Sequence, residues 1–496
     1  MTRPGDVAVR QRLLEQLDTS FVVEAAAGTG KTTVLVARVV ALVQSGKALL
    51  ERIIAVTFTE KAAGELKLRL RDALERARQT APEPAATHLR HALEQLEAAR
   101  IGTIHGVCAD LLREYPVEAG VDPMFDVAAE DEAAGLFSRA FERWFEHAVA
   151  TPPEGVRRLL RRRPQRSDDE APRELLRSAA WRLAEHRDFD GAWERPGFAR
   201  EVAIDAVVQR LERLSLHARA YTGDGSSRSS PFIDNLRSVA RFVDDLRHRE
   251  SVRERDFDDL EAGLTVLARD WNWERAPWKR DTFNGRTTDD VARERDDTFA
   301  ELKAFKNASE GDLAACLQTE LRPILDAYED EKARAGTLDF VDLLHKTRTL
   351  LRTQRAVRAA LRRRFSHVFV DEFQDVDPMQ VELVLLLASS TPDIDDAFST
   401  TIAPGALFVV GDPKQSIYRF RRADIALYER VKQHLVRQGA QVEYLSTSFR
   451  STPGIQAAVN AAFAQIMTPE TPGQAQYVPL EPHRPRTPSQ PSLVAL

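Results

Sequence analysis

Short, mostly apolar runs, each followed by a polar cluster, mark the first hundred residues and the stretch after residue 336. Runs of this length bounded by polar residues are typical of the buried strands of a parallel sheet. The runs that predict strands are Phe21–Glu24, Ile53–Val56, His367–Val370, Leu407–Val410 and Val442–Leu445. Helical spacing of apolar residues follows the first two runs, over about Lys31–Val43 and through Leu66, Leu70 and Leu74. This alternation predicts an α/β fold whose parallel sheet carries helices on both faces.

From about Pro116 to Gly336 the pattern changes to arginine-rich helical periodicity, and no run there reads as a buried strand. A large, mainly helical domain inserted into the α/β domain is therefore expected. The run from Arg157 to Arg166 holds six arginines, which either track a phosphate backbone or form a solvated face. The Gly/Ser-rich stretch Thr222–Pro231 predicts a loop.

Composition narrows the class of protein. A chain of 496 residues is too long for one core, and its 29% charged and 43% hydrophobic residues are typical of soluble globular domains. The net charge of −6 gives no global signal for nucleic acid but leaves room for a local basic track. Two distant cysteines, Cys108 and Cys316, form no metal or disulfide pattern and fit a reducing compartment. Without a signal peptide or a bilayer-spanning run, a cytoplasmic protein with no membrane association is expected.

The segment after the first strand has the composition of a phosphate-binding loop. Gly28 and Gly30 let the backbone approach phosphate oxygens closely, and the following helix adds its N-terminal dipole. Lys31 would reach the β- and γ-phosphates and Thr32 would bind Mg²⁺, which predicts ATP and Mg²⁺ as cofactors. The residues expected around the nucleotide phosphates are Ala25, Ala26, Ala27, Gly28, Thr29, Gly30, Lys31, Thr32 and Thr33. The usual first glycine is replaced by Ala25, and an ordinary strand–turn–helix is the alternative.

Asp371 and Glu372 follow a predicted strand and suit the second half of such a site. Asp371 would share the Mg²⁺ with Thr32, while Glu372 would orient and deprotonate the attacking water. An acidic pair capping a helix is the alternative. Ligands of parallel sheets bind beyond the carboxyl ends of the strands, where all five predicted strands carry polar clusters.

Further segments occur in the order found in one helicase family. These segments are Ala55–Ala63, Thr103–Gly106, Leu338–Phe340, Asp371–Asp375, Gly411–Arg421 and Ser448–Ser451. Over roughly Val7–Asn460 the chain thereby resembles the UvrD/Rep helicases of superfamily 1, in which the loop often begins with alanine. The resemblance implies a P-loop RecA-like motor domain (1A) formed by residues 1–118 and 336–447 and interrupted by a helical insertion (1B) at 119–335. Residues 448–496 would begin a second RecA-like domain (2A).

The resemblance also implies roles for single residues. Gln11 matches a glutamine that pairs with adenine, and Phe449 matches an aromatic side chain that stacks on the base. Arg450 matches an arginine that reaches the γ-phosphate. Gln374 and Gln415 match residues that sense the γ-phosphate and link it to the DNA groove. Lys31, Asp371, Glu372, Gln415 and Arg450 are the residues expected to act in hydrolysis.

Single-stranded or duplex DNA is the expected partner, and the single strand would be bound by loops on the other rim of the sheet. Phe58, Tyr418 and Phe420 match positions beside the bases, where aromatic stacking tolerates any sequence. The residues expected to contact phosphate or sugar are Thr57, His105, Arg419 and Arg421. For Phe58 or Phe420 taken alone, a place in the core is the alternative.

Two features refine the branch. Glu24–Thr32, Gly411–Gln415 and the long insertion resemble the RecB/AddA helicase–nucleases of recombination and repair, which implies a RecC/AddB-like partner subunit. No HxxKGLE-like or arginine-finger segment of the family occurs, and seven prolines between Pro469 and Pro491 precede the strand-like run Leu493–Leu496. Truncation is therefore expected.

The sequence thus predicts the ATP-binding N-terminal part of an ATP-dependent 3′–5′ DNA helicase or translocase. A nucleotide- and single-strand-binding module without helicase activity is the alternative. A P-loop kinase or GTPase is disfavoured by Gln374 and by Gln415 after a separate strand.

Overall fold

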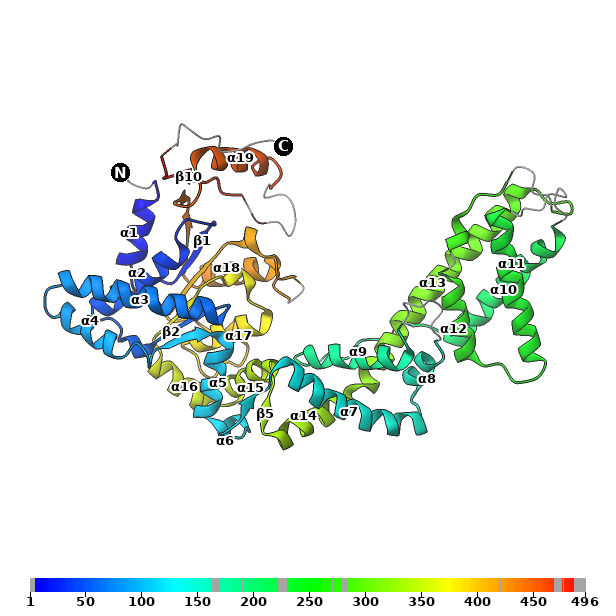
Figure 1. Ribbon diagram of the computed structural model, residues 1–496, viewed down its shortest axis with the longest axis horizontal. Coiled ribbons are helices and arrows are strands. Elements are labelled where there is room, and N and C mark those ends of the chain that lie inside the picture. The colour runs from blue at the N-terminus through cyan, green and yellow to red at the C-terminus, as the bar shows by residue number, and fades with distance from the viewer. Residues whose placement is uncertain are drawn as a thin grey trace. The chain divides into compact units, whose positions relative to one another are not determined.

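The computed structural model describes residues 5–162, 170–189, 191–195, 197–221, 230–269, 271–278, 283–419, 422–467, 475 and 477–485. The chain forms two compact units (Figure 1). The first unit is built from both ends of the chain, up to Ala128 and from Gly336 onward, and the second covers Ala129–Ala335.

A six-stranded parallel sheet is the centre of the first unit, with strand order β3-β2-β6-β7-β1-β8. The strands are β1 (Phe21–Ala25), β2 (Ile53–Thr57), β3 (Arg100–Thr103), β6 (His367–Val370), β7 (Leu407–Gly411) and β8 (Gln441–Leu445). All five predicted strands are confirmed. β3 was not predicted, because it is an edge strand in which buried and partly exposed residues alternate and no apolar run exists.

Side chains alternate across the sheet and fill one core on each face. Val22 and Ile54 point into the core under α5 and α15–α18, while Phe21, Val23 and Ala55 point into the core under α1–α4. The helices of one face are α1 (Val7–Glu15), α2 (Lys31–Gln44), α3 (Glu60–Thr80) and α4 (Ala85–Glu94). Those of the other are α5 (Ile104–Glu114), α15 (Phe340–Thr353), α16 (Arg355–Arg364), α17 (Pro378–Ala388) and α18 (Ile425–Arg437). The predicted α/β fold with helices on both faces is confirmed.

Short elements complete the first unit. Among its described residues, 3₁₀ turns lie in the loops at η1 (Leu50–Arg52), η3 (Phe373–Asp375), η4 (Ala397–Ser399) and η5 (Pro413–Gln415). α6 (Pro116–Ala119) follows α5, and α19 (Pro453–Phe463) follows the two-residue strand β9 (Thr447–Ser448), which pairs with β10 (Glu481–Pro482). The run Leu493–Leu496 and most of the proline-rich stretch before it lie outside the described residues.

The chain leaves and re-enters the first unit at one place. β4 (Asp126–Val127) pairs in parallel with β5 (Thr337–Leu338), and the Asp126 amide donates to the Gly336 carbonyl at 3.0 Å. Because the two crossing points are hydrogen-bonded to each other, a long insertion fits between them without disturbing the sheet.

The second unit is helical, as predicted, and Figure 1 shows α10, α11 and α13 running side by side. Its helices are α7 (Glu130–Ala150), α8 (Glu154–Leu160), α9 (Pro172–Glu185), α10 (Arg200–Ala220), α11 (Pro231–Glu250), α12 (Phe257–Leu267), η2 (Trp271–Glu274), α13 (Thr288–Glu320) and α14 (Arg322–Ala335). Two hydrophobic cores lie along the 33-residue α13, one with α10–α12 and one with α7–α9 and α14. The long helix therefore joins the two halves of this unit. No helix among the described residues has the length and apolar composition needed to cross a bilayer.

One arginine of the run in the second unit is internal, whereas Arg157 and Arg161 are exposed. Arg158 is 1% exposed and pairs with Glu261 and Asp312, while Arg157 pairs with Asp258. Both sequence-based interpretations are therefore wrong for Arg158, because a buried guanidinium holding carboxylates is neither a solvated face nor open to phosphate. The end of this run and most of the predicted Gly/Ser loop lie outside the described residues.

Candidate functional site

The loop between β1 and α2 has the backbone geometry that its glycines predicted. Gly28 and Gly30 have φ angles of +78° and +86°, a region that strains any residue with a Cβ. A Cβ on Gly28 would lie 2.5 Å from the Cβ of Arg450. Thr29 is fully buried and its hydroxyl donates to the Ala26 carbonyl at 2.7 Å. The loop is thus held from inside and packed closely against the segment after β8.

Two residues at the start of α2 meet the acidic pair after β6. Lys31 Nζ lies 2.5 Å from Glu372 Oε2, and the Thr32 hydroxyl donates to Asp371 Oδ2 at 3.0 Å. The parallel sheet brings these segments together because both follow the carboxyl ends of their strands. Glu372 has a left-handed backbone, with φ of +53°, which is uncommon for a residue with a side chain and is typical of functional loops.

The carboxylates beside Lys31 are crowded. Burial, together with the charge of Glu372, raises the pKa of Asp371, and the same two causes raise the pKa of Asp375 to about 6. A divalent cation would relieve this repulsion, and the Thr32 hydroxyl and Asp371 carboxylate are oxygen ligands of the kind that Mg²⁺ prefers. The residues present therefore fit a Mg²⁺ ion accompanying a polyphosphate.

A chain of hydrogen bonds leads from Glu372 to the loop after β7. Gln374 donates to Glu372 Oε2 at 2.9 Å and its amide oxygen accepts from the Asp412 amide at 2.8 Å. Asp412 in turn accepts from Gln415 Nε2 at 2.6 Å and pairs with Lys414. The two glutamines are thus linked through Asp412, a buried residue that the sequence did not single out; its only signal was its place directly after a predicted strand.

The segment after β8 lies against the phosphate loop. The Phe449 amide donates to the Gly28 carbonyl at 2.8 Å, and Arg450 is exposed beside Gly28. Ser448 is fully buried, and its hydroxyl has no hydrogen-bond partner among the described residues although it lies near Gly28. An unpaired buried hydroxyl beside a glycine loop fits a site that is completed by a polar ligand.

The structure does not bring Gln11 to the loop. Its side chain is exposed and donates to Glu15 on the same helix at 2.7 Å. The preceding residue, Arg10, faces inward and donates to the Thr29 carbonyl at 2.8 Å. One helical position, about 100° of rotation, separates the two side chains, and the sequence alone did not show which one faces the loop.

Those predicted DNA-contacting residues that the structure describes lie at the same edge of the sheet as the phosphate loop. Thr57 is the last residue of β2 and His105 follows β3, so the expectation that they lie on the other rim is wrong. The reason is that every strand of the sheet is parallel, and the loops after the strands share one edge. The rings of Phe58 and Tyr418 are 4.9 Å apart, centroid to centroid, and Arg419 is exposed beside them.

The other residues predicted to contact DNA differ in exposure and in their contacts. His105 packs edge-on against the half-exposed Phe340, with ring centroids 5.6 Å apart, whereas Thr57 is buried. Phe420 and Arg421 lie outside the described residues. Within the predicted DNA surface, the structure thus gives a contact for the partly exposed aromatic pair Phe58 and Tyr418 at the carboxyl edge of the sheet.

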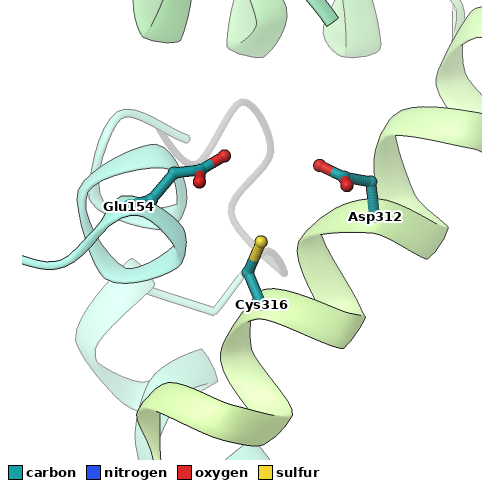
Figure 2. A group of neighbouring side chains, drawn as sticks. All are labelled: Glu154, Asp312 and Cys316. Carbon is teal, nitrogen blue, oxygen red and sulfur yellow. The ribbon is translucent and has the colours of Figure 1, made fainter. Parts of the chain in front are cut away.

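One group of side chains in the described part of the chain has the spacing of metal ligands, and it lies in the second unit. Figure 2 shows Glu154 on α8 pointing toward Asp312 and Cys316 on α13. Arg158 Nη1 already lies 3.0 Å from Glu154, 2.6 Å from Asp312 and 3.9 Å from Cys316 Sγ, and Arg195 pairs with both carboxylates. These guanidinium groups take the place of a metal cation, so the group is an internal ion cluster.

Comparison with known proteins agrees with this geometry. An ATP-dependent helicase/nuclease subunit of Desulforudis audaxviator is 31% identical over 94% of this chain and 40% of its own length. The corresponding helicase/nuclease subunits of Bacillus licheniformis (27% identical, 92% of this chain, 39% of the relative) and Moorella thermoacetica (29%, 92%, 34%) are also similar. The chain spans about two-fifths of the length of these relatives. The UvrD/REP helicase N-terminal domain matches residues 8–435, and the chain therefore belongs to the UvrD/REP helicase family.

Proposed function

We propose that this chain is the ATP-binding N-terminal part of an ATP-dependent 3′–5′ DNA helicase that acts in recombination and repair. The observation that carries the proposal is the meeting of Lys31 with Glu372 and of Thr32 with Asp371 at the sheet edge that also carries Phe58 and Tyr418. A phosphate site and an aromatic surface on one rigid sheet are what coupling of hydrolysis to single-strand binding needs.

In the proposed mechanism, the loop amides and the dipole of α2 bind the phosphates of ATP. Lys31, whose charge is neutralised by Glu372 without nucleotide, changes partner to the β- and γ-phosphates and frees that carboxylate. Thr32 and Asp371 would hold Mg²⁺, which would supply charge neutralisation of the phosphates. Glu372 then orients and deprotonates the attacking water, and Arg450 contacts the γ-phosphate.

The hydrogen bonds from Glu372 through Gln374 and Asp412 to Gln415 supply a route from the phosphates to the aromatic pair. When Lys31 leaves Glu372, the surroundings of that carboxylate change. Gln374 is bonded both to Glu372 and to the Asp412 amide, so the change reaches the loop after β7. Tyr418 belongs to this loop and contacts Phe58, so the loop would transmit the state of the nucleotide to bound DNA.

The names of the relatives support two further parts of the proposal. These names describe subunits, which favours assembly with a second, RecC/AddB-like subunit in the whole protein. The relatives are helicase/nucleases that are more than twice as long as this chain, so unwinding polarity and nuclease action are proposed only for the whole protein.

The direct test is Mg²⁺-dependent ATP binding, measured by calorimetry on the full chain. Lys31→Ala should abolish ATP binding. Among the described residues of the loop, the Lys31 ammonium is the only cation placed to neutralise the phosphates. Glu372→Gln should retain ATP binding and lose DNA-stimulated hydrolysis, because the amide keeps the shape but is no base. Undiminished ATP binding by Lys31→Ala would sink the proposal.

A further inference from the structure

The carboxamide of Gln374 is held by partners that use its nitrogen and its oxygen. Its side chain is buried, and Nε2 donates to Glu372 Oε2 at 2.9 Å and to Asp375 Oδ2 at 3.1 Å. Its oxygen accepts from the Asp412 amide at 2.8 Å. A buried N–H group that lacks an acceptor is costly, so the two N–H groups of the carboxamide need both carboxylates. Asp375 is thus one of two groups that decide which way the carboxamide points.

The charges around this carboxamide allow only one orientation. With its nitrogen toward the two carboxylates, its oxygen faces a backbone N–H group. The reverse orientation would place the oxygen against two anions and the NH₂ group against the Asp412 amide, so these contacts would become repulsive. The link between the loop after β6 and the loop after β7 therefore exists only while the nitrogen stays on the carboxylate side.

Glu372 cannot hold this orientation throughout the proposed reaction. Its Oε2 atom accepts from both Lys31, at 2.5 Å, and Gln374. In the proposed mechanism the same carboxylate binds the attacking water and takes up its proton, and a protonated carboxyl group is a weaker acceptor than a carboxylate. Gln374 then needs a second anion that takes no part in the chemistry.

Asp375 has the position of such an anion. It lies in the same 3₁₀ turn as Gln374, and its amide donates to the Glu372 carbonyl at 3.0 Å, so the backbone sets its place. Its other carboxylate oxygen, Oδ1, is buried and has no hydrogen-bond partner among the residues that the structure describes. Burial, and then the charge of Glu372, raise the pKa of Asp375 to about 6, which leaves the side chain mostly ionised at neutral pH.

We propose that Asp375 is a positioning residue that holds the Gln374 carboxamide toward the loop after β7 while Glu372 acts on the water. The inference rests on the proposed function, because it concerns how the same nucleotide site is coupled to bound DNA. With Asp375 in place, the bond from Gln374 to the Asp412 amide persists through nucleotide binding. Without Asp375 the carboxamide turns, and the loop that carries Tyr418 no longer responds to the nucleotide.

The experiment measures how far a nucleotide changes the affinity of the full chain for single-stranded DNA. A labelled deoxythymidine oligonucleotide is titrated by fluorescence anisotropy, with and without the saturating Mg²⁺ complex of a non-hydrolysable ATP analogue. The ratio of the two dissociation constants is the coupling factor, and coupled sites show a factor of about five or more in either direction.

Asp375→Ala should bring the coupling factor close to unity, because loss of a hydrogen bond to a charged group changes an equilibrium by about tenfold or more. The affinity for the oligonucleotide without nucleotide should stay unchanged. So should the affinity for the analogue without DNA, measured by calorimetry. A residue with a merely structural role would change these separate affinities and not their ratio.

Further variants separate the orientation of the carboxamide from charge. Asp375→Asn keeps an acceptor oxygen of the same reach and should retain most of the coupling. Asp377→Ser is the matched control, because it removes a carboxylate from the same loop while serine still caps α17 at the Gln380 amide, and it should leave the coupling unchanged. Asp375→Ser is too short to reach the carboxamide and takes the place of Asp375→Ala if that variant does not fold.

The outcomes separate this inference from the proposed function. Coupling that survives in Asp375→Ala or Asp375→Ser, or that is lost equally in Asp377→Ser, would overturn the inference. Loss of affinity for the analogue together with the coupling would also overturn it, because Asp375 would then support the whole phosphate site. If the unmodified chain binds both ligands without coupling, the inference fails and the ATP site stands. If it does not bind the analogue or the oligonucleotide, the proposed function itself is refuted.

Discussion

Replacement of Arg158 by methionine should destabilise the helical unit strongly. The guanidinium is 1% exposed and makes two hydrogen bonds of 3.0 Å to Glu261 and one of 2.6 Å to Asp312, whose side chains are each 2% exposed. Methionine fills a similar volume but supplies no donor, so two buried carboxylates lose their shared cation. These carboxylates lie on α12 and α13, and the loss therefore acts on the middle of the unit.

The expected loss in the free energy of unfolding depends on which ion pairs remain in the Arg158→Met variant. Removing one partner of a buried ion pair costs about 3–5 kcal/mol. Arg200 still pairs with Glu261 and Arg195 with Asp312, so the lower end, about 3 kcal/mol, is expected. Burial alone raises the pKa of Glu261, but the hydrogen bonds from Arg158 and Ser309 hold it below its usual value. Without Arg158 that pKa rises, so the destabilisation should shrink as the pH is lowered and the carboxyl group takes up a proton.

The assay uses the placement of the tryptophans. All of them lie in the second unit, so urea unfolding of the full chain followed by tryptophan fluorescence reports that unit. The control is Arg210→Met, which removes a half-exposed ion pair with Glu301 and should cost less than about 1 kcal/mol. If Arg158→Met costs no more than this control, the internal ion cluster does not stabilise the fold and the reasoning is refuted.

Two further predictions concern the first unit. Phe58→Ala should weaken binding of a deoxythymidine oligonucleotide by about 1–3 kcal/mol, measured by fluorescence anisotropy, and leave ATP binding unchanged. Unaltered oligonucleotide binding would mean that Phe58 only packs against Tyr418. Burial, and then the charges of Arg362, Arg38 and Arg52, lower the pKa of His367 to about 4. Because the folded pKa lies below the unfolded value, the stabilisation is complete above about pH 6.5 and is lost as the pH falls toward 4. Between pH 7 and pH 5 this loss is about 2 kcal/mol, and His367→Asn should remove it in urea titrations followed by circular dichroism; an equal loss in the variant would contradict the assignment.

The sequence by itself determined the elements, the insertion and the family. Strands buried on both faces must be apolar along their whole length, so the inner strands β1, β2, β6 and β7 were visible as apolar runs. Of the two edge strands, β8 was visible through Val442, Tyr444 and Leu445, whereas β3 has no apolar run. The helical insertion followed from the change of periodicity. The UvrD/Rep resemblance and its RecB/AddA type followed from motifs whose order is independent of conformation, and both are confirmed.

Only the tertiary structure decided which side chains meet. The contacts of Lys31 with Glu372 and of Gln374 with Asp412 join segments that are far apart in the chain. The order of the strands in the sheet brings these segments together, and hydrophobic periodicity predicts strands but not their order. The same holds for Arg158, whose neighbours in the sequence suggested a basic surface while its partners on α12 and α13 draw it inside.

The clearest case is at α1, where adjacent residues differ in role by a single helical step. Gln11 was predicted from its likeness to a family position, but the rotation of the helix turns it to solvent and turns Arg10 to the loop. That rotation is set by Leu13 and Leu17 packing into the core and by Asp6 bonding to the Thr447 amide. Such constraints come from packing and from distant backbone groups, and the residue types at positions 10 and 11 do not contain them.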